Sequence, residues 1–184
     1  VNMEHQLITG YDETGFFTAQ PWAPHVNFPP DHLTFGTWAE FGDECHVNFF
    51  SFRKIEPASE ERTIADSLKY AVDLYCHPSK HTAEPYAVGA DAYTKWIRAV
   101  KNGHGSSHGN WWNGTVWAEC RGKAAEYFME IASKYPDVAP VANGLAADYG
   151  AIAEALRKVS DKGMDSQAKI EILEQTAARE AGCI

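Results

Sequence analysis

The pattern of apolar and polar residues along the chain changes near residue 57. Before this point, short runs of aromatic and β-branched residues are separated by turn-forming residues, a pattern typical of strands and loops. After it, apolar residues recur every three or four positions, which is typical of amphipathic helices. The sequence therefore predicts an α+β fold, with a β-rich part over residues 1–56 and a helical lobe over residues 57–184.

The clearest strand signal is that of a β-hairpin near the start of the chain. Residues 5–11 form a short extended run, residues 12–15 (Asp-Glu-Thr-Gly) supply turn chemistry, and residues 16–19 add aromatic and β-branched side chains. The proline-rich residues 21–44 are expected to form an ordered loop, and the aromatic residues 46–55 to form a further strand.

Five stripes of apolar residues predict five helices in the second part of the chain. Ser59 has the side chain of a helix N-cap, and Gly103 is expected to end the second helix. The stripes run from Ile64 to Tyr75, from Tyr93 to Val100, from Trp117 to Ile131, from Leu145 to Val159 and from Ile172 to Thr176.

The few strands predicted in the first part of the chain would make a sheet of marginal stability by themselves. Because Val1 starts almost inside a strand, we expect strands from outside these residues to complete the sheet, for example from a partner chain or a second copy, in preference to complete coverage by the helices.

Composition narrows the classes of partner. The chain is 45% hydrophobic, enough for a core, and its 25 acidic against 16 basic residues give a net charge of -9. Such an excess of acidic residues disfavours binding to nucleic acid or to anionic membranes. No apolar run of about 18 residues is present, and no secretory signal begins the chain. A cytoplasmic location with no membrane partner is therefore expected.

The cysteines and histidines do not follow a metal-binding pattern. The four cysteines are Cys45, Cys76, Cys120 and Cys183. Their spacing predicts free thiols, and Cys76 and Cys120, which lie on helical stripes, are predicted to be buried and inert. His77 and His81 are four residues apart, but Pro78 breaks any helix that would place both on one face. The sequence predicts no metal site and no cofactor.

The candidate catalytic residues flank the predicted hairpin. If Tyr11 pairs with Phe16 and the register continues, His5 lies opposite Trp22, and Gln20 lies diagonally on the same face. An imidazole whose Nδ1–H is held by an amide oxygen can act as a base through Nε2. The alternative is that His5 and Gln20 simply begin a strand and precede a turn, and a register slip of one residue would separate them.

Several segments together resemble a known family. His5 with Gly10-Tyr11-Asp12, the aromatic strand Phe16-Phe17 and Gln20-Pro21 resemble the histidine hairpin of papain-like cysteine peptidases. The most similar branch is that of the bacteriocin-leader peptidases and the butirosin-biosynthesis H-protein acyltransferases. The helical part is similar to the H-protein type at Tyr93-x-x-Trp96, Gly109-Asn110 and Glu119-x-Arg121. The resemblance implies a papain-like α+β fold with a helical lobe, cysteine-dependent acyl chemistry on an amide or thioester, and catalytic roles for His5 and Gln20.

The chain departs from this family at two positions. The residue that orients the histidine is Asp or Asn in the family, whereas here it is Gln20, one methylene longer. The family's nucleophilic cysteine lies well before the histidine, and only four residues precede His5, so no cysteine here matches it. We therefore expect the nucleophile to come from outside these residues. Two alternatives remain: a non-catalytic module that binds a small molecule or peptide, and a stand-alone helical domain without activity.

A second group of candidate residues lies in the unusual segment 103–114, which is rich in Gly, His, Asn and Trp. It is predicted to be a loop between two helices. Trp111 and Trp112, together with Trp22, are expected to line a site for a small-molecule or peptide substrate, with Asn110 as a hydrogen-bond donor. The alternative is the start of a helix, with a tryptophan anchored in the core.

Overall fold

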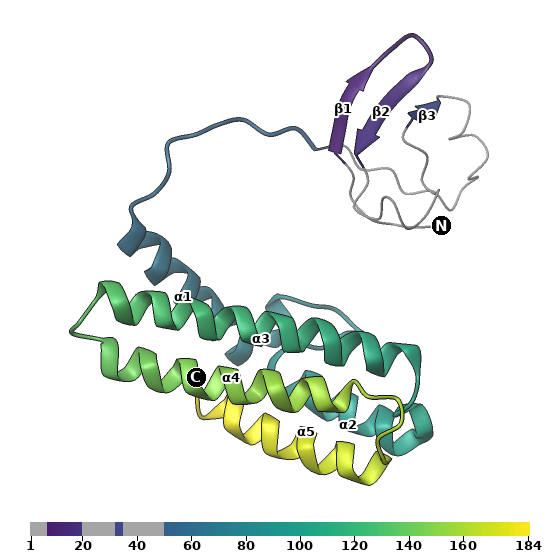
Figure 1. Cartoon of the computed structure of the whole chain (residues 1–184), viewed down its shortest axis with the longest axis vertical. Helices are drawn as coiled ribbons and strands as arrows, with labels where there is room; N and C mark the ends of the chain where they lie inside the picture. The colour runs from purple at the N-terminus through teal and green to yellow at the C-terminus, as the bar shows by residue number, and fades with distance from the viewer. Residues whose placement is uncertain (1–6, 20–31, 35–49) are drawn as a thin grey trace. The chain divides into compact units, whose positions relative to one another are not determined.

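The computed structural model describes residues 7–19, 32–34 and 50–184. The chain divides into two compact units, Val1–Glu56 and Pro57–Ile184, each of which is described by itself. The first unit contains strands and the second contains helices, so the structure is mostly helical with a small antiparallel sheet near its start (Figure 1).

The described part of the first unit is a three-stranded antiparallel sheet in the order β1-β2-β3. Strand β1 (Leu7–Tyr11) and strand β2 (Gly15–Ala19) form the predicted hairpin, and β3 (His32–Thr34) pairs with β2. Strand β3 lies within the segment that was expected to be a loop, so that expectation is wrong for these three residues. Its pairing with β2 is a long-range contact, which periodicity within three residues cannot reveal.

The strand expected over residues 46–55 is not formed in its described part. Residues 50–55 have no regular secondary structure, and residues 46–49 lie outside the described residues. Phe52 is 93% exposed and Ile55 is 71% exposed, so no neighbouring strand or helix buries their side chains. Aromatic content alone therefore predicted a strand where the packing that would stabilise one is missing.

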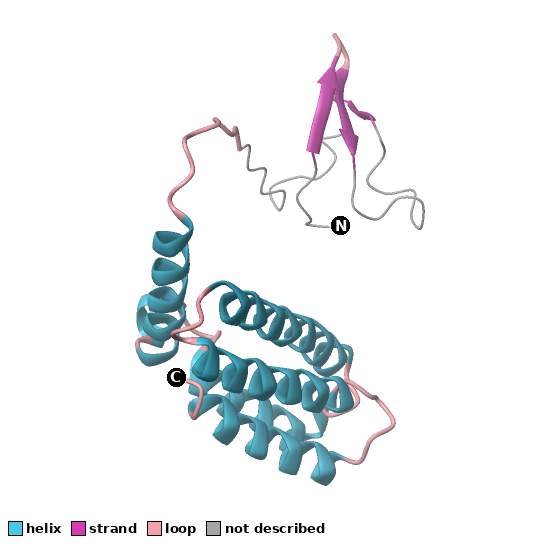
Figure 2. Ribbon diagram, turned by 60° about the vertical axis from the view of Figure 1, so that its left-hand side comes forward, coloured by secondary structure: helices cyan, strands magenta, loops and turns pink. Residues whose placement is uncertain are grey.

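The described part of the second unit contains five α-helices, as predicted. They are α1 (Glu60–Cys76), α2 (Gly89–Ala99), α3 (His108–Lys134), α4 (Ala139–Val159) and α5 (Ser166–Ala181). A short 3-10 turn, η2 (Pro78–Lys80), follows α1, and a π-helical turn, η3 (Val100–His104), follows α2. Figure 2 shows these helices in cyan, turned to a second view. None of them is long and apolar enough to cross a membrane.

Local sequence signals explain where several helices begin and end. The Ser59 hydroxyl accepts a hydrogen bond from the Arg62 backbone N–H, which confirms the predicted N-cap of α1. Asp165 caps α5 in the same way through the N–H of Ala168. Gly103 has a φ of 88°, a left-handed conformation that glycine adopts at little cost, and it lies at the predicted end of the second helix.

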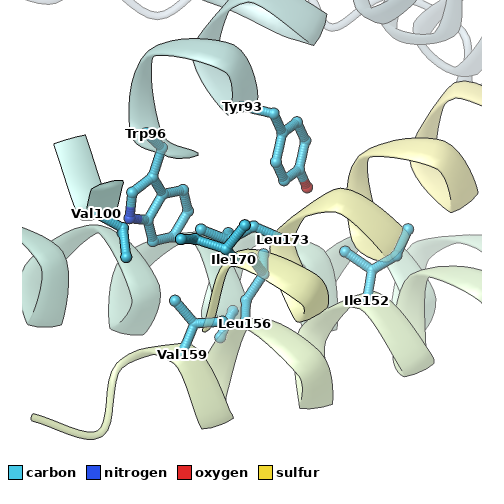
Figure 3. Close-up of a cluster of buried hydrophobic side chains, with 9 residues drawn as sticks. Tyr93, Trp96, Val100, Ile152, Leu156, Val159, Ile170 and Leu173 are labelled. Carbon is cyan, nitrogen blue, oxygen red and sulfur yellow. The ribbon is translucent and has the colours of Figure 1, made fainter. Parts of the chain in front are cut away.

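The core of the helical unit lies where α2, α3, α4 and α5 meet. It is formed mainly by large side chains from these helices and the π-helical turn, drawn in Figure 3: Tyr93, Trp96, Val100, Ile152, Leu156, Val159, Ile170 and Leu173. Lys169 is also fully buried, and its ammonium donates a hydrogen bond of 2.5 Å to the Gly105 carbonyl. This bond fixes the connection between α2 and α3 to α5. Helix α1 contributes no buried residue.

The predicted burial of two cysteines is wrong, because Cys76 and Cys120 are both exposed. Helix α3 buries instead Gly114, Ala118 and Ala125, and of the larger apolar residues in the predicted stripe it buries Ile131 alone. Small side chains let two helices approach closely, so most of the buried face of α3 is formed by small residues.

Candidate functional site

The predicted catalytic residues lie at the edge of what the structure describes. His5, Gln20 and Trp22 are outside the described residues, as is Cys45, so their roles stay predictions. The nearest described residues are Leu7 and Ala19, which pair with each other across the hairpin. His5 is two residues before Leu7, and Gln20 directly follows Ala19.

The register of the hairpin matches the prediction over only part of its length. Tyr11 pairs with Phe16 and Gly10 with Phe17, as expected. Between Gly10 and Ile8 the register shifts by one residue. The argument that placed His5 and Gln20 on one face assumed a single continuous register, and this assumption holds only as far as Gly10.

The opposite end of the hairpin is fixed by one carboxylate. Asp12 Oδ1 accepts hydrogen bonds from the backbone N–H groups of Thr14 and Gly15, at 2.7 and 2.9 Å, and from the Thr14 hydroxyl at 2.7 Å. His32 Nε2 on β3 lies 3.3 Å from the same oxygen. The hydrogen bonds from Thr14 are the main cause that lowers the pKa of Asp12 to about 2. This carboxylate therefore connects the turn of the hairpin to the third strand.

The tryptophan-rich segment is helical from His108 onward, which corrects the loop prediction and agrees with the alternative of a helix start. Residues 108–114 form the first two turns of α3, and Ser107 caps them by accepting a hydrogen bond of 3.1 Å from the Asn110 backbone N–H. Trp111 and Trp112 are 36% and 43% exposed. Their rings lie 5.1 and 6.3 Å from the His108 ring, and the Lys162 ammonium lies 5.6 Å from the Trp111 ring centre. These four side chains form an exposed aromatic cluster.

Asn110 does not belong to this exposed cluster. Its side chain is buried, its Oδ1 accepts a hydrogen bond of 2.8 Å from Trp96 Nε1, and its Nδ2 donates one of 2.9 Å to the Val159 carbonyl. The amide therefore connects α2, α3 and α4. Both ends of the Asn110 side chain are occupied by the protein itself, so the expected hydrogen-bond donor for a substrate serves the core instead.

The structure reveals a buried polar cluster that the sequence analysis did not place in a site. Glu180 on α5 accepts a hydrogen bond of 2.5 Å from the Tyr93 hydroxyl, and its other oxygen lies 2.6 Å from Arg121 Nη2. The Arg121 guanidinium also lies 4.9 Å from the Trp117 ring centre. The sequence contains one signal of this cluster: Glu180 lies four residues after Thr176, so it continues the apolar stripe of α5 and falls on the buried face of that helix.

Burial raises the pKa of two tyrosine hydroxyls in and beside this cluster. Burial is the largest cause that raises the pKa of the Tyr93 hydroxyl, and the negative charge of Glu180 adds to it. The same two causes raise the pKa of Tyr149 to about 12. At neutral pH both tyrosines are therefore neutral, and the Tyr93 hydroxyl donates to Glu180, which also forms the ion pair with Arg121.

The two histidines near Pro78 both contact one carboxylate, that of Asp73. His77 Nδ1 and His81 Nε2 each lie 2.8 Å from an oxygen of Asp73, and Lys80 Nζ lies 3.1 Å from that carboxylate. The hydrogen bonds from His81 and Lys80 are the main causes that lower the pKa of Asp73 to about 2. Among the described residues, no group of three or more potential ligands could hold a metal ion.

An apolar groove of about 670 Å³ lies between the first half of α1 and the connection from α3 to α4. Ile64 and Leu68 line it from α1, Ile131 from α3, and Val141 and Leu145 from α4. A smaller hollow of about 250 Å³ shares Ile64, Ile131 and Lys134 with it. Of the residues predicted to form a substrate site, the three that the structure describes, Asn110, Trp111 and Trp112, line neither cavity.

No model of a known protein family matches the chain, and no curated protein or solved structure matches it either.

Proposed function

We propose that this chain provides the histidine-bearing part of a papain-like cysteine hydrolase or acyltransferase that acts on an amide or thioester. His5 is the base in this proposal, Gln20 orients it, and the nucleophilic thiol comes from outside these residues. The observation that supports the proposal is that β1 begins at Leu7 and β2 ends at Ala19, so the segments that carry His5 and Gln20 continue from the same end of the hairpin. This supports their proximity only, because the register shift between Ile8 and Gly10 is of the kind that would place His5 and Gln20 on opposite faces.

The proposed chemistry is that of a thiol activated by an imidazole. His5 Nε2 accepts the proton of the thiol, and the sulfur attacks the carbonyl carbon of the substrate. The leaving amine or thiol takes the proton from the imidazolium, and an acyl-thioester remains on the enzyme. Water then releases the acyl group in a hydrolase, whereas an amine or alcohol accepts it in an acyltransferase.

The test is turnover by the complete gene product that contains this chain. The probe substrates are a thioester, S-acetyl-N-acetylcysteamine, and an amide, a peptide p-nitroanilide. We expect turnover that iodoacetamide abolishes, and a loss of about 10²–10⁴-fold in the His5→Ala variant. His108→Ala changes another histidine and is expected to leave the rate unchanged. Full activity of His5→Ala would overturn the proposal. Loss of activity in Cys45→Ser, Cys76→Ser, Cys120→Ser or Cys183→Ser would overturn the external nucleophile.

A second candidate function is a non-catalytic module that binds a small molecule or peptide. The exposed aromatic cluster of His108, Trp111, Trp112 and Lys162 favours it, because aromatic faces and a cation together bind planar or anionic ligands. In this case turnover would be absent in the wild type. Trp111→Ala and Trp112→Ala would then reduce ligand binding, whereas His5→Ala would not.

A further inference from the structure

The apolar groove of the helical unit lies along one side of α1. Helix α1 is 17 residues long and has no buried residue, although Ile64, Ala65 and Leu68 lie along the groove on one side of it. An amphipathic helix gains most of its stability by packing its apolar face against another element. The groove therefore leaves the apolar face of α1 without the packing that such a face usually has.

The charges that border the two cavities are mostly negative. Four carboxylates line them, from Glu60, Glu61, Glu130 and Asp137, and among the described lining residues Lys134 is the only cation. The Lys134 ammonium is already paired with Glu60 and Glu130. Within the described residues, no ion pair involves Glu61 or Asp137.

The carboxylates also affect Tyr135, at the end of the groove that lies next to Asp137. Tyr135 lines the groove next to Asp137, and its hydroxyl has a raised pKa, caused first by burial and then by the charges of Glu60 and Glu61. An occupant with an anionic group would meet repulsion here, whereas a cationic group would meet Glu61 and Asp137, which no described cation pairs with. The border of the groove therefore selects for positive charge.

We propose that this groove binds an amphipathic helical segment of a partner protein, in which Lys or Arg residues border a stripe of apolar side chains. The apolar stripe would pack against Ile64, Leu68 and Val141, and the cations would pair with Glu61 and Asp137. This is the helix-in-groove mode of recognition, in which apolar contacts give affinity and the charges at the border give specificity. The occupant would supply the packing that α1 lacks.

Two model peptides of equal hydrophobicity test the charge preference. The probes are fluorescein-labelled helices about four turns long, one of leucine and lysine and one of leucine and glutamate. We expect fluorescence anisotropy to show binding of the lysine peptide at least about 10-fold tighter than that of the glutamate peptide, equivalent to about two rim ion pairs. Failure of the lysine peptide to bind would overturn the proposal.

Charge-reversal variants locate the binding site. Glu61→Lys with Asp137→Lys is expected to weaken the lysine peptide about 10-fold and to strengthen the glutamate peptide. Glu119→Lys with Glu154→Lys changes the net charge by the same amount at exposed positions that do not line either cavity. This control pair is expected to change the affinity less than about twofold. Equal effects of the two pairs would show attraction to net charge alone and would overturn the proposal.

A second pair of variants tests the apolar contact. Val141 lines the groove and is 68% exposed, so Val141→Ser is expected to fold normally and to weaken the lysine peptide by about 3–10-fold. Met129 is 52% exposed on α3 and lines neither cavity, so Met129→Ser is the matched control. Circular dichroism verifies the fold of each variant. The molecular mass in solution is measured at several protein concentrations. If the mass rose with concentration and Val141→Ser abolished this rise, the groove would bind a second copy of this chain, and the proposal of a different partner would be overturned.

Discussion

Arg121 and Glu180 are 59 residues apart in the sequence and are joined by an ion pair of 2.6 Å between α3 and α5. Glu180 is 6% exposed and Arg121 is 23% exposed, so water screens this pair less than the other ion pairs of the helical unit. Because Glu180 also accepts the hydrogen bond from Tyr93 on α2, one carboxylate connects three helices.

Glu180→Gln removes the charge of this carboxylate but keeps an oxygen that can accept from Tyr93. The variant removes the anionic partner of Arg121. The Nε atom of Arg121 already lacks a hydrogen-bond partner, so the guanidinium would lose its main stabilising contact. We expect the free energy of unfolding, measured by urea denaturation, to fall by about 2–4 kcal/mol. The loss is expected to be smaller than for a fully buried ion pair, because the Arg121 side chain is partly exposed to water.

The control for this prediction is Glu174→Gln on the same helix. Glu174 lies 3.7 Å from Lys101, and both side chains are more than half exposed. Exposed ion pairs contribute little, so this variant is expected to change stability by less than about 0.5 kcal/mol. Equal losses in the two variants would contradict the special role of the buried pair.

The sequence was sufficient to predict the main elements, because these depend on local patterns. The stripes from Ile64 to Tyr75 and from Leu145 to Val159 gave two of the five helices, and the turn after Tyr11 gave the hairpin. The third strand was not predictable in this way, since His32–Thr34 is defined by its pairing with β2. Periodicity describes one segment at a time and carries no information on which segments pair.

The candidate site was harder to predict for a related reason. Glycine and asparagine have low helix propensity, so the segment around Asn110 and Gly114 was expected to be a loop. The structure shows why these residues suit a helix here: Asn110 bonds to Trp96 and Val159, and Gly114 lies against Ser160. Tertiary contacts of this kind override local propensity. His5 and Gln20 lie outside the described residues, so their predicted roles await experiment.

Asn110→Ala is predicted to destabilise the helical unit, because the buried Trp96 N–H and Val159 carbonyl would each lose a hydrogen bond. The expected decrease in the free energy of unfolding is about 2–4 kcal/mol, measured by urea denaturation. Asn113→Ala changes an exposed residue of the same type on the same helix, and it is expected to be neutral within about 0.5 kcal/mol. A stable Asn110→Ala variant that had lost only ligand binding would support the substrate role instead.

Two glycines of α3 are predicted to respond in opposite ways to the same substitution. A Cβ added to Gly114 would lie 2.7 Å from the Cβ and 2.9 Å from the backbone N of Ser160, so Gly114→Ala must displace the end of α4. A Cβ at Gly122 would meet nothing within 4 Å. Thermal unfolding should show a loss of about 1–3 kcal/mol for Gly114→Ala. Gly122→Ala should instead gain about 0.5–1 kcal/mol from its higher helix propensity.

The ranking of these two variants is the decisive measurement. Helix propensity favours alanine at both positions to a similar degree, so only the contact with Ser160 separates them. If Gly114→Ala were as stable as Gly122→Ala, the close approach of α3 to the end of α4 would be contradicted.

The last prediction concerns the pH dependence of the hairpin turn. Asp12 has a folded pKa of about 2, below its ordinary value of 3.8, because its carboxylate accepts hydrogen bonds from Thr14 and Gly15. A lowered pKa means that the ionised carboxylate is favoured by folding, so its contribution is fully present above pH 3.8 and is lost as the pH falls through about 2. Carboxyl ¹³C chemical shifts of Asp12 should therefore titrate near pH 2. Thr14→Ala removes the hydroxyl donor and should move the midpoint toward 3.8. Thr9→Ala removes a hydroxyl of the same hairpin that bonds to the Phe17 carbonyl instead, and it should leave the midpoint unchanged. A wild-type midpoint at 3.8 would show that these hydrogen bonds do not hold the turn.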